Sequence, residues 1–343
     1  MSKKKQVVTS KKQSNLESNA IYLAFATGIV GLITGLILFS GAMIPVFAGK
    51  HGSLGLVATF LGAIISFVVY LFSVSSLQPK ALFKFSNWTL ALTHGLLAFV
   101  LYAVLFYIIG LSFQGATMDT LASAIVLTIT SAFAGYFTYL SASNMNTMKI
   151  STLLATFLVI GIFISMLTAH DPNWWHYNFS ALGAGEGVSG EAFNWTLIIA
   201  GMIAVSLASF LALDLKVLKG SGILSPKTRA MVIRVCLSGI GIFLAFVGIF
   251  VVSAYPVLHV LSATGMTVIF GAMIIILPWI VPNFSKAFYI ASYILLLALV
   301  IAAWLFLVVG YFNLTALEMI AFAIIFTWLI LFVRHISAMF EDK

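Results

Sequence analysis

Apolar residues occupy long unbroken runs of this chain, and polar residues are confined to the short stretches between them. Within each run Leu, Ile, Val, Phe and Ala cover every face of a helix, which is typical of helices that cross a bilayer. Strands of a membrane barrel would be shorter and would alternate apolar and polar positions. Ten such helices are predicted, at residues 20–48, 54–77, 89–113, 118–140, 149–168, 193–213, 230–253, 257–281, 287–310 and 314–336. The sequence therefore predicts an all-α, polytopic membrane bundle.

Composition excludes a water-soluble fold. Of the 343 residues, 62% are hydrophobic and 8% are charged, whereas soluble domains carry about 25% charged residues. The single cysteine, Cys236, lies inside an apolar run. One cysteine excludes both a disulfide framework and a cysteine-rich metal site.

The basic residues predict the orientation of the bundle. With a cytoplasmic N-terminus, sixteen Lys and Arg residues fall on the inner side of the membrane and only Lys50 falls on the outer side. We therefore expect both termini in the cytoplasm and the protein in a plasma membrane. The excess of Lys over Arg favours a bacterial source. Because topology accounts for the net charge of +8, we expect membrane lipids and no nucleic acid as partners.

Three regions follow from this arrangement: a basic cytoplasmic tail at 1–19, a four-helix membrane part at 20–148 and a six-helix module at 149–343. The module contains a long outer loop at 169–193, rich in aromatic, His and acidic residues. Its tryptophans suit the membrane interface. In the first span, Gly31-x-x-x-Gly35 predicts close packing of another helix.

Polar groups that could carry chemistry gather on the predicted outer side. Besides the candidates discussed below, Asp119, Asn178 and Asn194 belong to this outer-face group. A carboxylate within hydrocarbon costs about 2.5–3.5 kcal/mol and usually faces a partner or a water-filled cavity. Glu318, one turn into the last span, is therefore a candidate buried acid. Its alternative interpretation is an interfacial carboxylate in contact with water.

A divalent metal is one hypothesis for this side. Imidazoles and carboxylates bind zinc, and the sequence offers five such groups, although the spacing of the first three matches no established motif. The candidate ligands are His170, Asp171, His176, His259 and Glu318.

A second hypothesis pairs Ser180 with a histidine as nucleophile and base. The catalytic candidates are then Ser180, His176, His259 and Glu318, although Ser180 does not lie in a G-x-S-x-G elbow. The alternative is that these groups cap helices and hold the loop over the bundle.

Nucleotide and haem cofactors are not expected. The loop glycines between 183 and 190 lack the preceding strand and the following Lys of a phosphate loop. They predict a turn into the sixth span, with Asn194 as a possible N-cap. His94 and His335 form no bis-histidine pair at matching depth, so a haem ligand set is missing.

The second half resembles a six-span family called domain of unknown function 998, over about residues 149–340, and more distantly the DRAM-like six-span proteins. The similarity rests on Ser180-x-Leu182-Gly183 in the loop, Phe193-Asn194 and Gly201 in the next span, His259 after Pro256, and Glu318 in the last span. Ala181 departs from the pattern, because related loops often have an acid there, and four extra spans precede the module.

The resemblance implies a topology and an outer-face site, without a reaction. The more distant resemblance to the DRAM-like proteins favours a lipid as the ligand. Our leading interpretation is a protein that binds or handles a lipid or other amphiphile in an outer-leaflet cavity. The alternatives are a membrane-embedded hydrolase or transferase with a His/acid or metal site, and a small-solute transporter.

Overall fold

The computed structural model describes residues 3–47, 52–77, 80, 84–217, 225–281 and 284–341, so Lys50 and His51 lie outside the described residues. Ten of the described helices are long and apolar enough to cross a membrane. This confirms the predicted polytopic helical bundle. The chain divides into two compact units, Met1–Met145 and Asn146–Lys343, close to the predicted boundary after residue 148.

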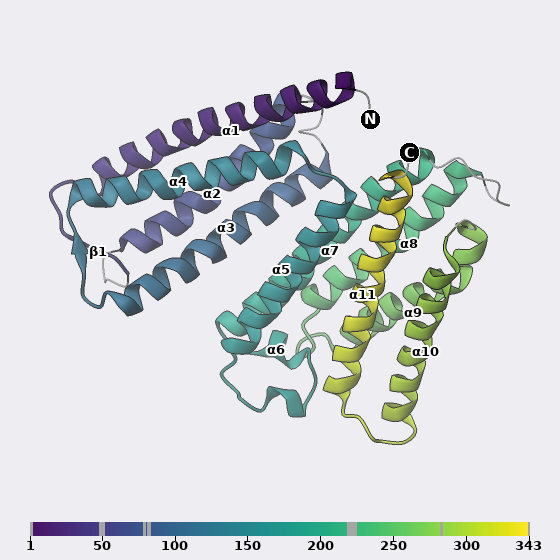
Figure 1. The fold of residues 1–343 in the computed structure, drawn as a ribbon. Helices are drawn as coiled ribbons and strands as arrows, with labels where there is room; N and C mark the ends of the chain where they lie inside the picture. The colour runs from purple at the N-terminus through teal and green to yellow at the C-terminus, as the bar shows by residue number, and fades with distance from the viewer. Residues whose placement is uncertain are drawn as a thin grey trace. The chain divides into compact units, whose positions relative to one another are not determined.

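The N-terminal unit consists of four long helices and a short antiparallel strand pair (Figure 1). α4 packs along α1 and α2, and α3 packs on α2. In the strand pair, Ile44 lies opposite Met118 and Pro45 opposite Thr117, which ties the α1–α2 connection to the α3–α4 connection. The elements are α1 (Lys3–Leu38), β1 (Ile44–Pro45), α2 (Leu54–Leu77), α3 (Phe85–Ser112), β2 (Thr117–Met118) and α4 (Thr120–Ser143).

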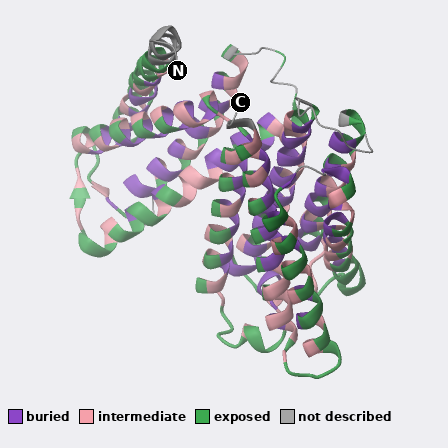
Figure 2. Ribbon diagram, turned by 45° about the vertical axis from the view of Figure 1, so that its right-hand side comes forward, coloured by how far each residue is buried: buried purple, intermediate pink, exposed green. Residues whose placement is uncertain are grey.

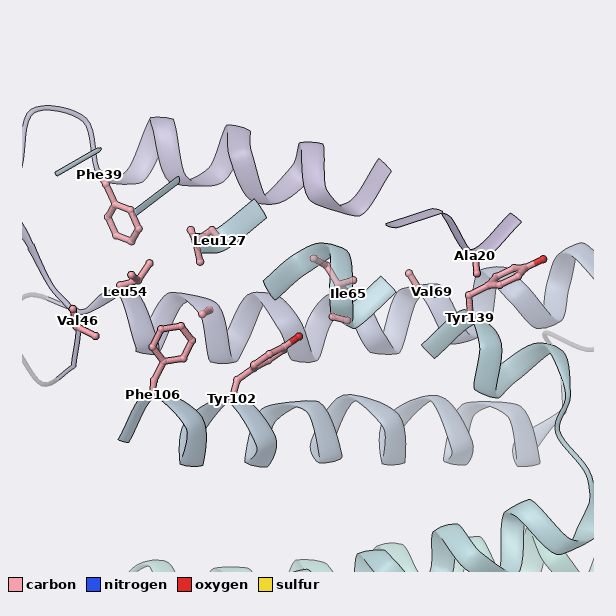
Figure 3. Close-up of a cluster of buried hydrophobic side chains, with 12 residues drawn as sticks. Ala20, Phe39, Val46, Leu54, Ile65, Val69, Tyr102, Phe106, Leu127 and Tyr139 are labelled. Carbon is pink, nitrogen blue, oxygen red and sulfur yellow. The ribbon is translucent and has the colours of Figure 1, made fainter. Parts of the chain in front are cut away.

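Large side chains form the core of this unit (Figure 3). Leu54, Phe106 and Leu127 are almost fully buried. Tyr102 joins the same cluster and donates its hydroxyl to the carbonyl of Thr130 at 2.6 Å. Its buried polar atom is therefore satisfied across two helices.

Gly31 and Gly35 lie where α1 meets α4. A Cβ at Gly31 would collide with the Leu127 carbonyl, and a Cβ at Gly35 would collide with the backbone of Ala124. The predicted small-residue packing is confirmed, because these glycines let the two backbones approach closely.

The C-terminal unit is a ring of six long helices in which α5, α7, α8, α9, α10 and α11 each contact the next, and α11 closes on α5. Between α5 and α7 lies the loop of residues 168–187, which contains a 3₁₀ turn and one short helix (Figure 1). The elements are α5 (Thr147–Leu167), η2 (Trp174–His176), α6 (Ala181–Ala184), α7 (Val188–Val217), α8 (Pro226–Ile249), α9 (Pro256–Ile280), α10 (Lys286–Leu307) and α11 (Leu314–Glu341).

Buried residues line the inner helix faces of the ring, and many exposed residues on the outward faces are large and apolar (Figure 2). α7 and α8 approach closely because Gly201 and Gly241 face each other, and a Cβ on either would meet the backbone of the other. The outward apolar residues are what a lipid-facing surface requires.

Several helix ends differ by a few residues from the predicted ones, and glycines account for two of the differences. The first span ends at Leu38 rather than near residue 48, because Gly41 adopts φ +72° and the chain then enters β1. The sixth span begins at Val188, directly after Gly187 with φ +71°. The predicted glycine turn into this helix is therefore confirmed, but Asn194 lies inside α7 and is not its N-cap.

Candidate functional site

Ser180 lies on a tight turn at the start of α6. The N–H of Gly183 donates to the Ser180 carbonyl at 3.0 Å, and Asn194 donates its side-chain N–H to the Gly183 carbonyl at 2.8 Å. A Cβ at Gly183 would collide with the Asn194 amide and the Phe193 ring. The loop turn is thus seated on α7, which fixes the position of Ser180.

His259 comes from the first turn of α9 and contacts the loop serine. Its Nε2 lies 2.9 Å from Ser180 Oγ, and its Nδ1 lies 2.8 Å from the carbonyl oxygen of Phe250. The carbonyl can only accept, so Nδ1 must carry a hydrogen. In the neutral ring Nε2 is therefore the acceptor, and the Ser180 hydroxyl donates to it.

The end of α8 faces the other side of this imidazole. Phe250 is the C-cap of α8, and its carbonyl is the one that binds Nδ1. Helix C-termini carry partial negative charge and favour a nearby cation. This placement orients the ring and stabilises an imidazolium formed when His259 takes a proton.

Glu318 contacts the serine turn from the first turns of α11. Its Oε2 accepts the N–H of Phe179 at 2.5 Å. The backbone N–H of Ser180 also faces this carboxylate, while the single hydroxyl hydrogen of Ser180 is donated to His259, as described above. Glu318 thus satisfies the buried backbone donors just before α6 and brings an acid next to the serine.

Other bonds secure the loop to α11. The carbonyl of Trp175 accepts from Thr315 Oγ1 at 2.8 Å and from Asn313 Nδ2 at 3.2 Å. Next to Ser180, the Phe179 ring packs edge-on against Phe193, with 5.3 Å between ring centroids. The loop is therefore held at several points over one end of the ring, and we call this the loop end.

The arrangement has the parts of a nucleophile–base pair: a hydroxyl, a base within hydrogen-bond reach and a third group that orients the base. Ser180 is 6% exposed and His259 is 4% exposed. Little water therefore reaches the pair in this conformation. Chemically, the site can move the hydroxyl proton to His259 and leave a nucleophilic oxygen on Ser180.

The structure brings together Ser180, His259 and Glu318, but it does not gather all predicted groups. His176 is exposed and stacks on Trp175 at 3.7 Å, and His170 and Asp171 are also exposed. In the described part of the chain, which includes all five predicted metal ligands, no three His, Cys, Asp or Glu side chains are close enough to hold a metal ion.

The remaining outer-face candidates are Asp119, Asn178 and Asn194. Asp119 caps α4 by accepting the N–H of Ala122 at 2.7 Å. The Asn178 side chain has a buried oxygen without a hydrogen-bond partner. Asn194 holds the Gly183 turn, as described above. Asp119 and Asn194 therefore position elements of the fold, and Asn178 has no such role through its side-chain oxygen.

Sequence reasoning missed the role of Phe250, because a backbone carbonyl has no side-chain signature. It also missed a second pair, His94 and Ser141, whose Nε2 and Oγ lie 2.9 Å apart in the N-terminal unit. The signal that was available is the set of residues behind the family resemblance. These residues come from the loop, α7, α9 and α11 and are linked by direct contacts: Ser180, Gly183, Asn194, His259 and Glu318.

Comparison with known proteins gives one match. The family described as "Protein of unknown function (DUF998)" matches residues 152–335, which is more than half of the chain and includes every residue of the contact network above. The four N-terminal spans precede the matched segment. No curated protein and no solved structure matches the chain.

Proposed function

This chain belongs to the DUF998 family, and from that premise we propose that it handles a lipid or other amphiphile by acyl transfer at Ser180. The observation that carries the proposal is the hydrogen bond from Ser180 Oγ to His259 Nε2, with Nδ1 held by the Phe250 carbonyl. Ser180 also lies in a loop, directly after Phe179, whose N–H donates to the Glu318 carboxylate, whereas a serine that only links two helices has no such acid beside it.

In the proposed reaction, Ser180 Oγ attacks the acyl carbonyl carbon while His259 Nε2 takes the hydroxyl proton. The bond from that carbon to the leaving alcohol oxygen then breaks, and His259 returns the proton to the alcohol. An acyl ester remains on Ser180. Water or a second alcohol attacks this ester, again with His259 as the base.

Glu318 is a positioning residue in this scheme. Its carboxylate holds the N–H of Phe179, so it sets the serine turn against His259. Because Ser180 and His259 are both buried, the acyl group reaches Ser180 when the loop of residues 168–187 opens. Such loop motions commonly admit substrate to a closed site.

We also propose that the loop end faces the outside of a bacterial plasma membrane, with both termini in the cytoplasm. The support is the distribution of Lys and Arg, none of which lies between residues 150 and 215. A reporter that fluoresces only in the cytoplasm, fused after Lys343, is expected to be bright. A dark fusion of full-length protein contradicts this orientation.

Labelling tests the acyl-transfer proposal directly. We expect an alkyl fluorophosphonate to modify the purified protein in mild detergent at Ser180, as located by peptide mass spectrometry. Ser180→Ala removes the adduct, and Ser141→Ala, the matched control from the N-terminal unit, keeps it. A folded protein without an adduct at Ser180 contradicts acyl transfer. If that protein nevertheless retains a stoichiometric lipid, the function is binding alone, which is the second candidate.

A further inference from the structure

Fixed positive charge is missing from the loop end of the C-terminal unit. No Lys or Arg occurs in residues 150–215, 235–285 or 287–333, which include the loop, the α8–α9 turn and the α10–α11 turn. Proteins bind phosphate groups chiefly through Arg and Lys, or through free backbone N–H groups. At Ser180, the neighbouring N–H group of Phe179 already donates to Glu318.

Negative charge is present instead. Asp171, Glu186 and Glu191 are exposed on the loop or the first turn of α7, and Glu318 lies against the serine turn. Positive-inside topology explains the missing cations, but it does not require these acids. A phosphate that approaches Ser180 past this loop would therefore meet like charge and no fixed cation of this unit.

The residue before Ser180, Phe179, belongs to a cluster of aromatic rings. The Phe179 ring lies 6.3 Å from the ring of Trp174 and 6.1 Å from that of Phe322, and Phe322 continues to Phe326 at 4.5 Å. These rings offer apolar contact to the hydrocarbon part of a substrate. Recognition next to the nucleophile is thus apolar, and the charge around it is negative.

We infer that the acyl donor of this site is an amphiphile without a phosphate group, with a neutral or cationic head. This inference rests on the proposed acyl transfer at Ser180 and adds the substrate class. Phosphate-bearing amphiphiles are disfavoured by the four carboxylates and gain no ion pair in return. A neutral glycerolipid ester has the expected chemistry.

Two matched probes test the inference. Both carry a fluorophosphonate on the same alkyl chain; one chain ends in uncharged triethylene glycol and the other in a phosphate monoester. At low ionic strength we expect the neutral probe to label Ser180 at least tenfold faster. The ratio should fall as salt is added, because exposed charges are screened over about 8 Å at 0.15 M.

Charge-removing variants test whether the loop carboxylates cause the ratio of the two labelling rates, neutral probe over phosphate probe. The triple variant Asp171→Asn, Glu186→Gln, Glu191→Gln should lower the ratio at least threefold and change the neutral rate less than twofold. The matched control is Asp214→Asn, about 35 Å from Glu191 along α7 at 1.5 Å per residue, which should leave the ratio unchanged.

The outcomes separate the two claims. Equal rates, a faster phosphate probe, or a ratio unaffected by the triple variant overturns the substrate class while acyl transfer stands. Labelling of Ser180 by neither probe in folded protein overturns the proposed function, and the substrate class with it.

Discussion

Each unit of this molecule contains a histidine with both ring nitrogens hydrogen-bonded, one to a backbone carbonyl and one to a serine hydroxyl. In the N-terminal unit, His94 binds the carbonyl of Leu90 in its own helix and the hydroxyl of Ser141 in α4. In the C-terminal unit, Ser180 lies in a loop and the carbonyl belongs to the end of another helix.

The difference lies in the surroundings rather than in the bond. The Nε2 to Oγ distance is 2.9 Å in both pairs. Ser141 lies in a regular helix, and the His94 ring packs at a tilt against the ring of Tyr70 with 4.8 Å between centroids, so that pair links helices. Ser180 instead has a carboxylate beside it and a helix C-terminus behind its histidine. A serine–histidine bond alone therefore does not define a reactive site.

Removing each histidine should separate the pairs most strongly. His259→Ala removes the proposed base, and general-base catalysis contributes about 10²–10⁴-fold, so labelling of Ser180 should slow at least 100-fold. His94→Ala should change that rate less than twofold. The measurement is the labelling rate with the neutral probe, in protein shown to be folded by size-exclusion chromatography. Similar losses of labelling rate in the two variants would show that the two pairs do not differ in function.

Replacing Glu318 tests the role of the carboxylate beside the serine, which the N-terminal pair lacks. Glu318→Ala leaves the Phe179 N–H without its acceptor, and we expect the labelling rate of Ser180 to fall about tenfold, the equivalent of about 1.4 kcal/mol. Glu318→Gln keeps an acceptor oxygen and should recover most of the rate. If Gln is as damaging as Ala, the residue acts through its charge and the positioning role is wrong.

The fold was largely predictable because bilayer thickness sets both the length and the apolar character of each span. The exceptions, at Leu38 and Val188, lie where glycines with positive φ and local turns override hydropathy. The site was predictable only as a set of candidates. Ser180 and His259 are 79 residues apart. The pattern of apolar and polar residues does not indicate that the loop with Ser180 meets the helix with His259. The exposed positions of His170 and His176 were equally invisible in sequence.

Two glycine substitutions, one in each unit, test whether the position of Ser180 depends only on the packing of its own unit. Gly183→Ala pushes on Asn194 and Phe193 and should cost about 1–3 kcal/mol of unfolding free energy, with slower labelling of Ser180. Gly35→Ala forces α1 from α4 and should cost a similar amount without changing the labelling rate. Unfolding by SDS titration and labelling of the same samples give both numbers. Slower labelling in Gly35→Ala contradicts this separation.

The smallest effect is expected at Ser141. Ser141→Ala removes one hydrogen bond from buried His94 and should lower the free energy of unfolding by about 1 kcal/mol. Ser141→Thr, which keeps the hydroxyl, is the control. A loss of activity toward the neutral probe in Ser141→Ala, with stability intact, would make the N-terminal pair functional as well.

The close contact of α1 with α4 has a consequence for biosynthesis. Gly35 meets Ala124, which the ribosome adds about 90 residues later, or roughly 5–20 s at elongation rates of about 5–20 residues per second. During that interval the glycine face of α1 lies against lipid or against the insertion machinery. The α1–α4 contact therefore forms only after the fourth helix has been made, and a chain truncated after α3 leaves the glycine face of α1 uncovered.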